Sequence, residues 1–310
     1  MRTTELDISG SLAWKEGLPR PQWDLIETWI ESRCGPDRRA DAWVAVCRQW
    51  LAELGPALGR GYDVAESDHF LALASLEDAP GRSLLQFAER CRAVVLSVLA
   101  GVAEFKIPGK QVILALRTAE EYYRYISLYF PEGGHGGSAG IHIREGYPHI
   151  ALCGKQVWML ENTLAHELMH ASLQHLTMPL WLEEGLAQMF EHDMTGRSLL
   201  QVDTEMARRH KRYWAKHGLD ELWRGEGFFR PGRGQELSYQ LAEILVRLLI
   251  EEARPRWFGL VREPQRRFFA FVRQARESDC GEAACRKHLQ FGLGDLAARF
   301  LGRGTWSPGL

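Results

Sequence analysis

Two histidines and a glutamate lie within five consecutive residues, His166-Glu167-Leu168-Met169-His170, and these are the side chains best suited to chemistry. On an α-helix, residues four apart lie on one side and about 6 Å apart along the axis, so both imidazoles reach one metal ion. Glu167 then faces the open side of that ion, where it takes a proton from a metal-bound water. The pattern predicts metal-assisted hydrolysis.

The sequence around this trio indicates a buried helix. Ionisable groups are rarely buried without partners, and a metal ion is an economical partner for two histidines and a carboxylate. The alternative is a helix that carries two solvated histidines, because so short a pattern also arises by chance. The apolar context favours the metal site. The apolar positions are Leu164, Ala165, Leu168, Met169, Ala171 and Leu173.

A catalytic zinc usually has three protein ligands and leaves the fourth position to water, so a third donor is expected downstream. His175 follows the pair too closely for the spacing and glycine turn of the metzincin pattern. Glu191 and His192 lie at the far end of the next predicted helix, where we expect them to be solvated.

That next helix is predicted over Pro179 to Glu191, begun by its proline and apolar on one side. It places two acidic residues, Glu183 and Glu184, next to each other. Periodicity alone does not choose between them.

The segment from Trp181 to Ala187 reads Trp-Leu-Glu-Glu-Gly-Leu-Ala. It resembles the Trp-Leu-x-Glu-Gly-x-Ala stretch that follows the zinc helix in the gluzincins, which include thermolysin-like, aminopeptidase N-like and peptidase MA-like proteins. The resemblance implies one Zn²⁺ per chain, held by His166, His170 and Glu184. The connection from His170 to Glu184 is shorter than in thermolysin or aminopeptidase N and is similar to the minimal peptidase MA-like proteins. Because of this departure, the resemblance predicts the metal ligands but not the shape of the substrate pocket.

A second resemblance lies in the segment from Glu236 to Ile250. In aminopeptidase N-like enzymes, a tyrosine that opens an apolar helix after the zinc site donates a hydrogen bond to the oxyanion, and Tyr239 is in the matching place. The alternative is that Tyr239 only packs at the mouth of a core helix. Ser238 is interpreted as a helix-start residue, and Gln188, one turn after Glu184, as a partner of that carboxylate.

The elements that must position these residues fall into three stretches. Residues 1–60 are expected to be a helical N-terminal region, residues 61–195 an α/β part with the zinc helix and the third-ligand helix, and residues 196–310 a helical C-terminal subdomain. Strands before the zinc helix and helices after it resemble an α+β gluzincin core with a small mixed sheet. The elements expected around the middle stretch are an extended Phe70–Ala74, a helix from Leu84 to Leu99, a strand over Lys110–Leu116, a helix over Thr118–Tyr125, and strands over Ile141–Ile143 and His149–Leu152.

The two strands just before the zinc helix are predicted to form a hairpin. In gluzincins the sheet edge at this point pairs with an extended substrate, and strand addition is a general mode of peptide binding. The hairpin is therefore the expected edge for a peptide substrate. We interpret His135, His142 and His149 as surface or strand-face residues rather than ligands.

Composition argues for one intracellular catalytic chain. The net charge of −2 does not favour a general nucleic-acid binder. Six cysteines form no clear framework and are expected to be reduced thiols. Residues 1–10 have no apolar signal core and the apolar part of 93–103 is too short to span a bilayer, so we expect a cytoplasmic location without membrane contact.

Together these features predict a zinc-dependent metallopeptidase with a peptide or protein substrate. Glu167 is the expected general base on the zinc-bound water and the donor of its proton to the leaving amine, and Tyr239 is the expected oxyanion donor. A zinc hydrolase for a non-peptide bond and a metal-stabilised binding protein without turnover are the two alternatives. The sequence leaves the oligomeric state open.

Overall fold

The structure is a computed structural model that describes residues 7–75, 80–133, 138–196, 202–230, 232–253 and 263–309. His135, in the glycine-rich loop, lies outside these described residues. The chain divides into two compact units, one of residues 1–94 and 105–171 and the other of residues 95–104 and 172–310. Helices together with a five-stranded mixed sheet confirm the α+β class.

The first unit contains all the described strands. Its elements, in chain order, are β1 (Leu12–Lys15), β2 (Leu18–Pro21), α1 (Trp23–Arg33), α2 (Pro36–Leu58), β3 (Tyr62–Glu66), β4 (Phe70–Ser75), most of α3 (Pro80–Val98), β5 (Gln111–Leu116), α4 (Ala119–Ile126), β6 (Gly140–Ile143), β7 (His149–Cys153) and most of α5 (Val157–Leu173). The strands and helices expected between residues 70 and 153 are thus confirmed within a few residues. The first sixty residues are not helical throughout, because the β1–β2 hairpin precedes α1.

This hairpin turns at Glu16 and Gly17, which both have positive φ angles, 54° and 70°. A two-residue turn with both φ angles positive matches the twist of its flanking strands, and glycine takes that conformation without strain. The turn therefore explains why a helical prediction fails at this point of the chain.

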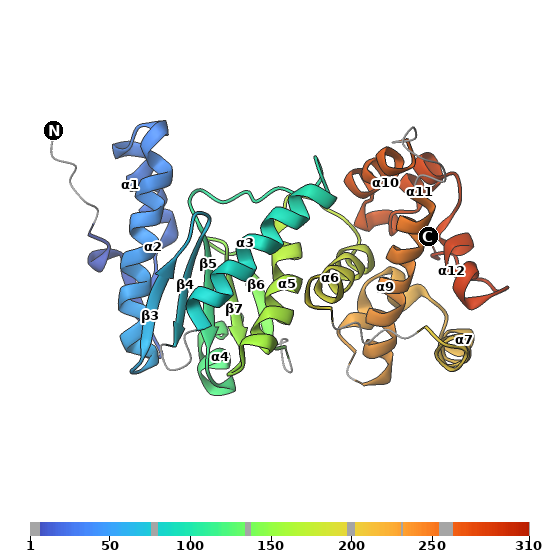
Figure 1. Ribbon diagram of the computed structural model, residues 1–310, viewed down its shortest axis with the longest axis horizontal. Coiled ribbons are helices and arrows are strands. Elements are labelled where there is room, and N and C mark those ends of the chain that lie inside the picture. Colours follow the sequence, from blue (N-terminus) through green and yellow to red (C-terminus); the bar gives the residue numbers. More distant parts are fainter. Residues whose placement is uncertain are drawn as a thin grey trace. The chain divides into compact units, whose positions relative to one another are not determined.

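The five-stranded sheet has the order β3-β4-β5-β7-β6. The central strands β4, β5 and β7 run parallel, while β3 and β6 are antiparallel edge strands. Figure 1 shows α1 and α2 on one face of this sheet and α3 and α5 on the other. Because both faces are covered, β4 and β5 are almost wholly buried, which is why they read as continuous apolar runs.

The face under α1 and α2 is packed with aromatic rings around a buried histidine. Trp23 meets Trp50 edge to face at 5.2 Å. His149 is fully buried beside them, with Nε2 2.6 Å from the Tyr125 hydroxyl and Nδ1 2.7 Å from the Tyr147 carbonyl oxygen. Burial lowers the pKa of His149 to about 4. The ring is therefore neutral, donates from Nδ1 to the carbonyl and accepts at Nε2 from the hydroxyl.

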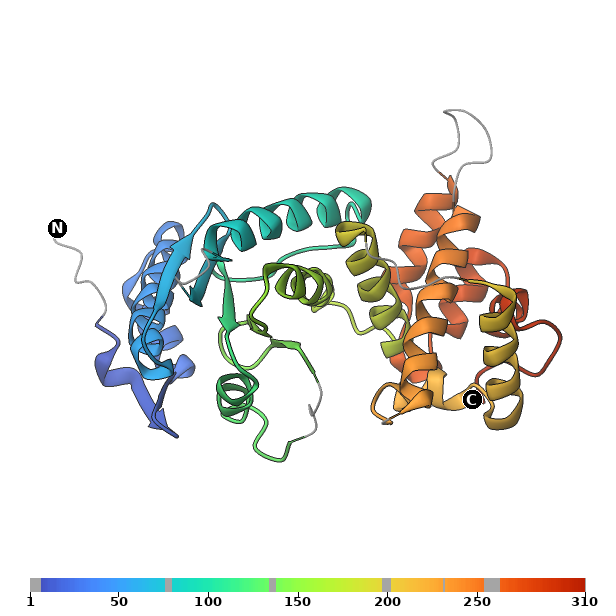
Figure 2. The ribbon, with the colours of Figure 1, turned by 60° about the horizontal axis from the view of Figure 1, so that its bottom comes forward.

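The second unit is helical in its described part. Its helices are α6 (Leu180–Thr195), α7 (Thr204–His217), α8 (Asp220–Trp223), α9 (Arg233–Ala253), α10 (Glu263–Gln274), α11 (Glu282–Leu289) and α12 (Leu293–Leu301). Helix α9 packs against α6, α10 and α12, and Figure 2 shows it among these helices. Within the described part of the chain, no helix is both long and apolar enough to cross a membrane.

A second buried histidine, His210 of α7, ties α7 to α9. Its Nε2 lies 3.1 Å from Oε1 of Gln240, and Trp214 Nε1 donates to its Nδ1 at 3.2 Å. Burial lowers the pKa of His210 to about 4. Both ring nitrogens are satisfied only while the ring is neutral, since Nδ1 must accept a hydrogen bond.

These neutral histidines predict a pH-dependent stability. The unfolded chain binds a proton at each histidine below about pH 6.5, whereas His149 and His210 resist protonation down to about pH 4 in the folded chain. The free energy of unfolding therefore falls as pH drops from about 6.5 to 4, by up to about 3 kcal/mol for each of the two histidines.

The measurement is Tm at pH 7 and pH 5 for wild type and His210→Gln. We expect a smaller decrease in Tm between the two pH values in the variant. His217→Gln, an exposed position on the same helix, is the control and should keep the wild-type drop; an equal drop in all three proteins would contradict the account.

Candidate metal centre

Helix α5 is fixed in the first unit by a buried leucine ridge. Leu160, Leu164 and Leu168 follow each other at four-residue steps and all are buried. Because this ridge faces the interior, the remaining sides of the helix are set as well. His166 and His170 are half-buried beside the ridge.

The two imidazoles converge through equivalent atoms. Nε2 of His166 lies 3.1 Å from Nε2 of His170, and the ring centroids are 4.8 Å apart. Zinc–nitrogen bonds of about 2.0–2.1 Å with tetrahedral angles would place two ligand nitrogens about 3.3 Å apart. The observed separation fits two ligands of one ion, although a neutral N–H···N hydrogen bond has the same length.

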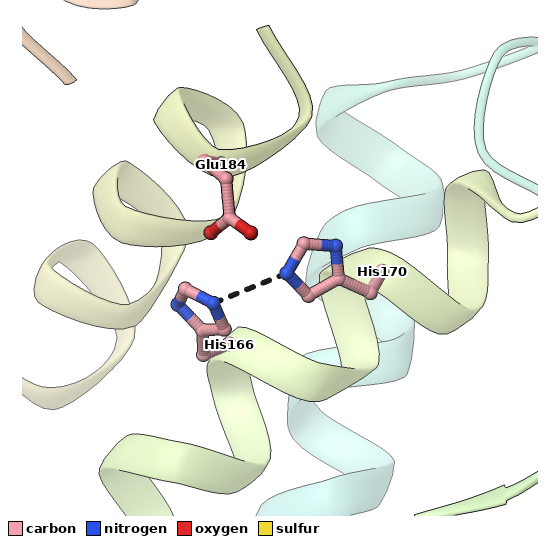
Figure 3. Close-up of side chains that lie close together, drawn as sticks. All are labelled: His166, His170 and Glu184. Atoms are coloured by element: carbon pink, nitrogen blue, oxygen red, sulfur yellow. Dashed lines mark hydrogen bonds between the residues drawn. The ribbon is translucent and has the colours of Figure 1, made fainter. Parts of the chain in front are cut away.

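Glu184 of α6 completes this group. Among the described residues, one set of three metal-ligating side chains comes together, formed by His166, His170 and Glu184, and their ligand atoms all lie within 4.8 Å of one another. Figure 3 shows the carboxylate turned toward the two rings. Two imidazole nitrogens and a carboxylate oxygen are a donor set that zinc accepts in catalytic sites. Glu183, its neighbour, is not part of the set.

Local packing explains the residues around Glu184. Trp181 is fully buried, donates from Nε1 to the Cys280 carbonyl at 2.9 Å and meets Trp223 edge to face at 5.3 Å. A Cβ on Gly185 would lie 2.5 Å from the carbonyl oxygen of Ala242 in α9. Glycine is therefore required for the close approach of α6 to α9, and the tryptophan anchors the first turn of α6.

Glu167 lies on α5 between the histidines and is 7 % exposed. Its charge acts on the buried phenol of Tyr122, whose hydroxyl lies 2.6 Å from Ser138 Oγ. Burial above all, with Glu167 contributing, raises the pKa of Tyr122. The phenol is therefore neutral, and Glu167 lies between the two histidines in the chain with little access to solvent.

Tyr239 lies on α9 and is half-buried, with its ring edge to face against Phe228 at 5.0 Å. Because α9 begins at Arg233, Tyr239 lies inside the helix rather than opening it. Ser238 likewise is buried inside the helix, where it donates to the Gly234 carbonyl at 2.9 Å, so the prediction of a helix-start role is wrong. The oxyanion role of Tyr239 stays a prediction.

The prediction of a solvated His192 is wrong. This residue is buried on α6, and its Nδ1 lies 2.9 Å from Oε1 of Glu243 in α9. The hydrogen bond to Glu243 raises the pKa of His192. Arg247 donates to the same carboxylate at 2.9 Å and pairs with Asp193 at 3.0 Å. This network joins α6 to α9 two turns beyond Glu184.

The sequence interpretation of His142 as a surface or strand-face residue is correct in its second form, because His142 lies on β6 and is buried. Burial first, and then the charges of Arg144 and His170, lower the pKa of His142. The alternation in Ile141-His142-Ile143 is the signal that would have set this histidine on the sheet face opposite the two isoleucines.

Comparison of the sequence with models of known protein families finds no match, and comparison with curated proteins finds none either.

If this group of side chains binds zinc, the two adjacent glutamates should differ in effect. In Glu184→Ala the third donor is lost. Loss of a residue that only supports a ligand already lowers metal affinity by about 10-fold or more, so we expect zinc affinity to fall by at least about 10-fold. In Glu183→Ala we expect about one zinc per chain, as in wild type. The measurement is zinc content by elemental analysis after dialysis against a weak chelator. Equal zinc in the two variants would contradict the assignment of Glu184.

Proposed function

We propose that this chain is a zinc-dependent metallopeptidase of the gluzincin type, with His166, His170 and Glu184 as the zinc ligands. The observation that supports the proposal best is the convergence of these three donors, with Glu167 next to the first histidine. Because no family model and no curated protein matches the chain, the proposal depends on these residues and on the motif resemblance.

The donor set favours catalysis over a purely structural site. Structural zinc is closed by four protein ligands, whereas catalytic zinc has three and leaves one position open. The described residues offer three. A buried carboxylate at Glu167, outside the ligand set, has no structural purpose in binding zinc and suits a general base.

The proposed mechanism assigns one task to each side chain. Bound zinc supplies Lewis-acid polarisation of the scissile carbonyl and a water of lowered pKa. Glu167 takes a proton from the attacking water and gives it to the leaving amine, so that a neutral amine departs. Tyr239 is proposed to donate a hydrogen bond from its phenol hydroxyl to the oxyanion.

A peptide substrate is supported by the strand beside α5. In the described sheet, β6 is an edge strand, and a Cβ on its Gly140 would lie 2.2 Å from Cγ2 of Thr163 in α5. The edge therefore lies directly against the helix that carries the two histidines. An edge strand binds an extended peptide through main-chain hydrogen bonds, which favours a peptide over other electrophiles.

Glu167→Gln is the direct test of the proposed function. The amide keeps the shape of the side chain but cannot take a proton, so we expect cleavage of a peptide library to slow by about 10²–10⁴-fold with zinc content unchanged. Glu161→Gln, also on α5, is the matched control and should cleave as wild type. Wild-type protein with bound zinc and no cleavage of any peptide would contradict the proposal and favour a binding role.

Tyr239→Phe tests the oxyanion role. If the phenol donates to the oxyanion, its loss lowers kcat by about 10²-fold or more, with KM and zinc content little changed. Tyr213→Phe on α7 is the control for loss of a hydroxyl from a ring that stacks on His217. An unchanged kcat in Tyr239→Phe would show that the ring only packs against Phe228.

A further inference from the structure

The outer edge of β6 exposes the main chain of His142. Cys153 N donates to Ala139 O at 2.7 Å, and the antiparallel register pairs Ile141 with Ala151 and His142 with Ile150. Hydrogen-bonded pairs alternate along an antiparallel ladder, so Ile141 bonds to β7 and the N–H and C=O of His142 point away from it. An added strand would bond to His142.

The side chain of His142 points to the α5 face of the sheet. Ile143 lies in the core under α1 and α2, and Ile141 packs against the same core. Alternation therefore turns Gly140 and His142 to the opposite face, where Thr163 of α5 meets Gly140. The imidazole of His142 thus lies on the side of the sheet that faces the metal-binding helix.

This imidazole is buried without a hydrogen bond. His142 is 9 % exposed, and neither Nδ1 nor Nε2 has a partner among the described residues. Burial first, and then the charges of Arg144 and His170, lower its pKa to about 3. The neutral ring therefore offers one N–H donor and one acceptor nitrogen, and native proteins rarely leave both unused.

We propose that His142 selects the substrate residue that pairs with it on the edge of β6, and that this residue has a small uncharged side chain that both donates and accepts hydrogen bonds, namely Ser, Thr or Asn. The inference rests on the proposed function for the presence of a peptide there. Residues opposite each other in neighbouring strands project to the same face, so the substrate side chain meets the ring.

The preference follows from what each class of side chain does to the ring. A hydroxyl or amide satisfies the donor and the acceptor together. An apolar side chain of the same size leaves both nitrogens without a hydrogen bond, and a charged one has to be desolvated. Sites built for hydrogen bonding reject such analogues strongly.

The test measures binding separately from turnover. Short peptides that differ at one position by isosteric pairs, Thr against Val and Asn against Leu, are titrated by fluorescence anisotropy onto zinc-loaded Glu167→Gln protein. At one position of the peptide we expect the polar member to bind at least about 10-fold more tightly. Adding His142→Phe should reduce this ratio to about 1, while Ile141→Val, on the other face of the same strand, should keep it.

His142→Gln retains a donor and an acceptor and should keep most of the preference. If His142→Phe does not fold, His142→Gln and His142→Leu are compared instead. A ratio that survives in both His142→Phe and His142→Leu overturns the inference, as does uniform weakening of all peptides without a change in ratio. A ratio that depends on His142 in the Glu167→Gln protein, together with no cleavage by the zinc-loaded wild type, supports recognition by His142 and overturns only the proposed turnover.

Discussion

Helical periodicity brings two imidazole nitrogens to 3.1 Å from each other on α5, and a carboxylate joins them within 4.8 Å. Holding these three polar groups together removes part of their hydration, which costs free energy. A metal ion that accepts a lone pair from each of them would offset that cost. Other features serve this arrangement. The leucine ridge sets the rotation of α5, and Gly185 permits the close packing of α6 on α9. The apolar residues of α5 and the glycine of α6 therefore position the side chains that carry the donor atoms.

The elements next to the site were predictable because local physics decides them. Central strands such as β5 are covered on both faces and read as unbroken apolar runs. Thr118 caps α4 through a reciprocal hydrogen-bond pair with Glu121, a pattern that is local in sequence. The β1–β2 hairpin was missed since its turn depends on positive φ angles at Glu16 and Gly17 rather than on strand composition.

The site itself could be predicted only in part. The histidine pair follows from spacing along one helix, which requires no knowledge of the rest of the fold. Adjacent residues such as Glu183 and Glu184 point about 100° apart, and helical periodicity does not choose between them. The resemblance of the Trp181–Ala187 segment to the gluzincins named Glu184, which is the residue grouped with the histidines. The pairing of His192 with Glu243 spans 51 residues, and the burial of His142 depends on strand order, so neither was available from local pattern.

The central claim is that His166, His170 and Glu184 bind zinc through nitrogen and oxygen atoms. Zinc K-edge X-ray absorption on the purified zinc-loaded chain tests it most directly, because the six free cysteines offer sulfur as an alternative. The account predicts about four light-atom ligands near 2.0–2.1 Å, with the multiple scattering of two imidazoles. A sulfur shell near about 2.3 Å, or a zinc without imidazole scattering, would contradict it.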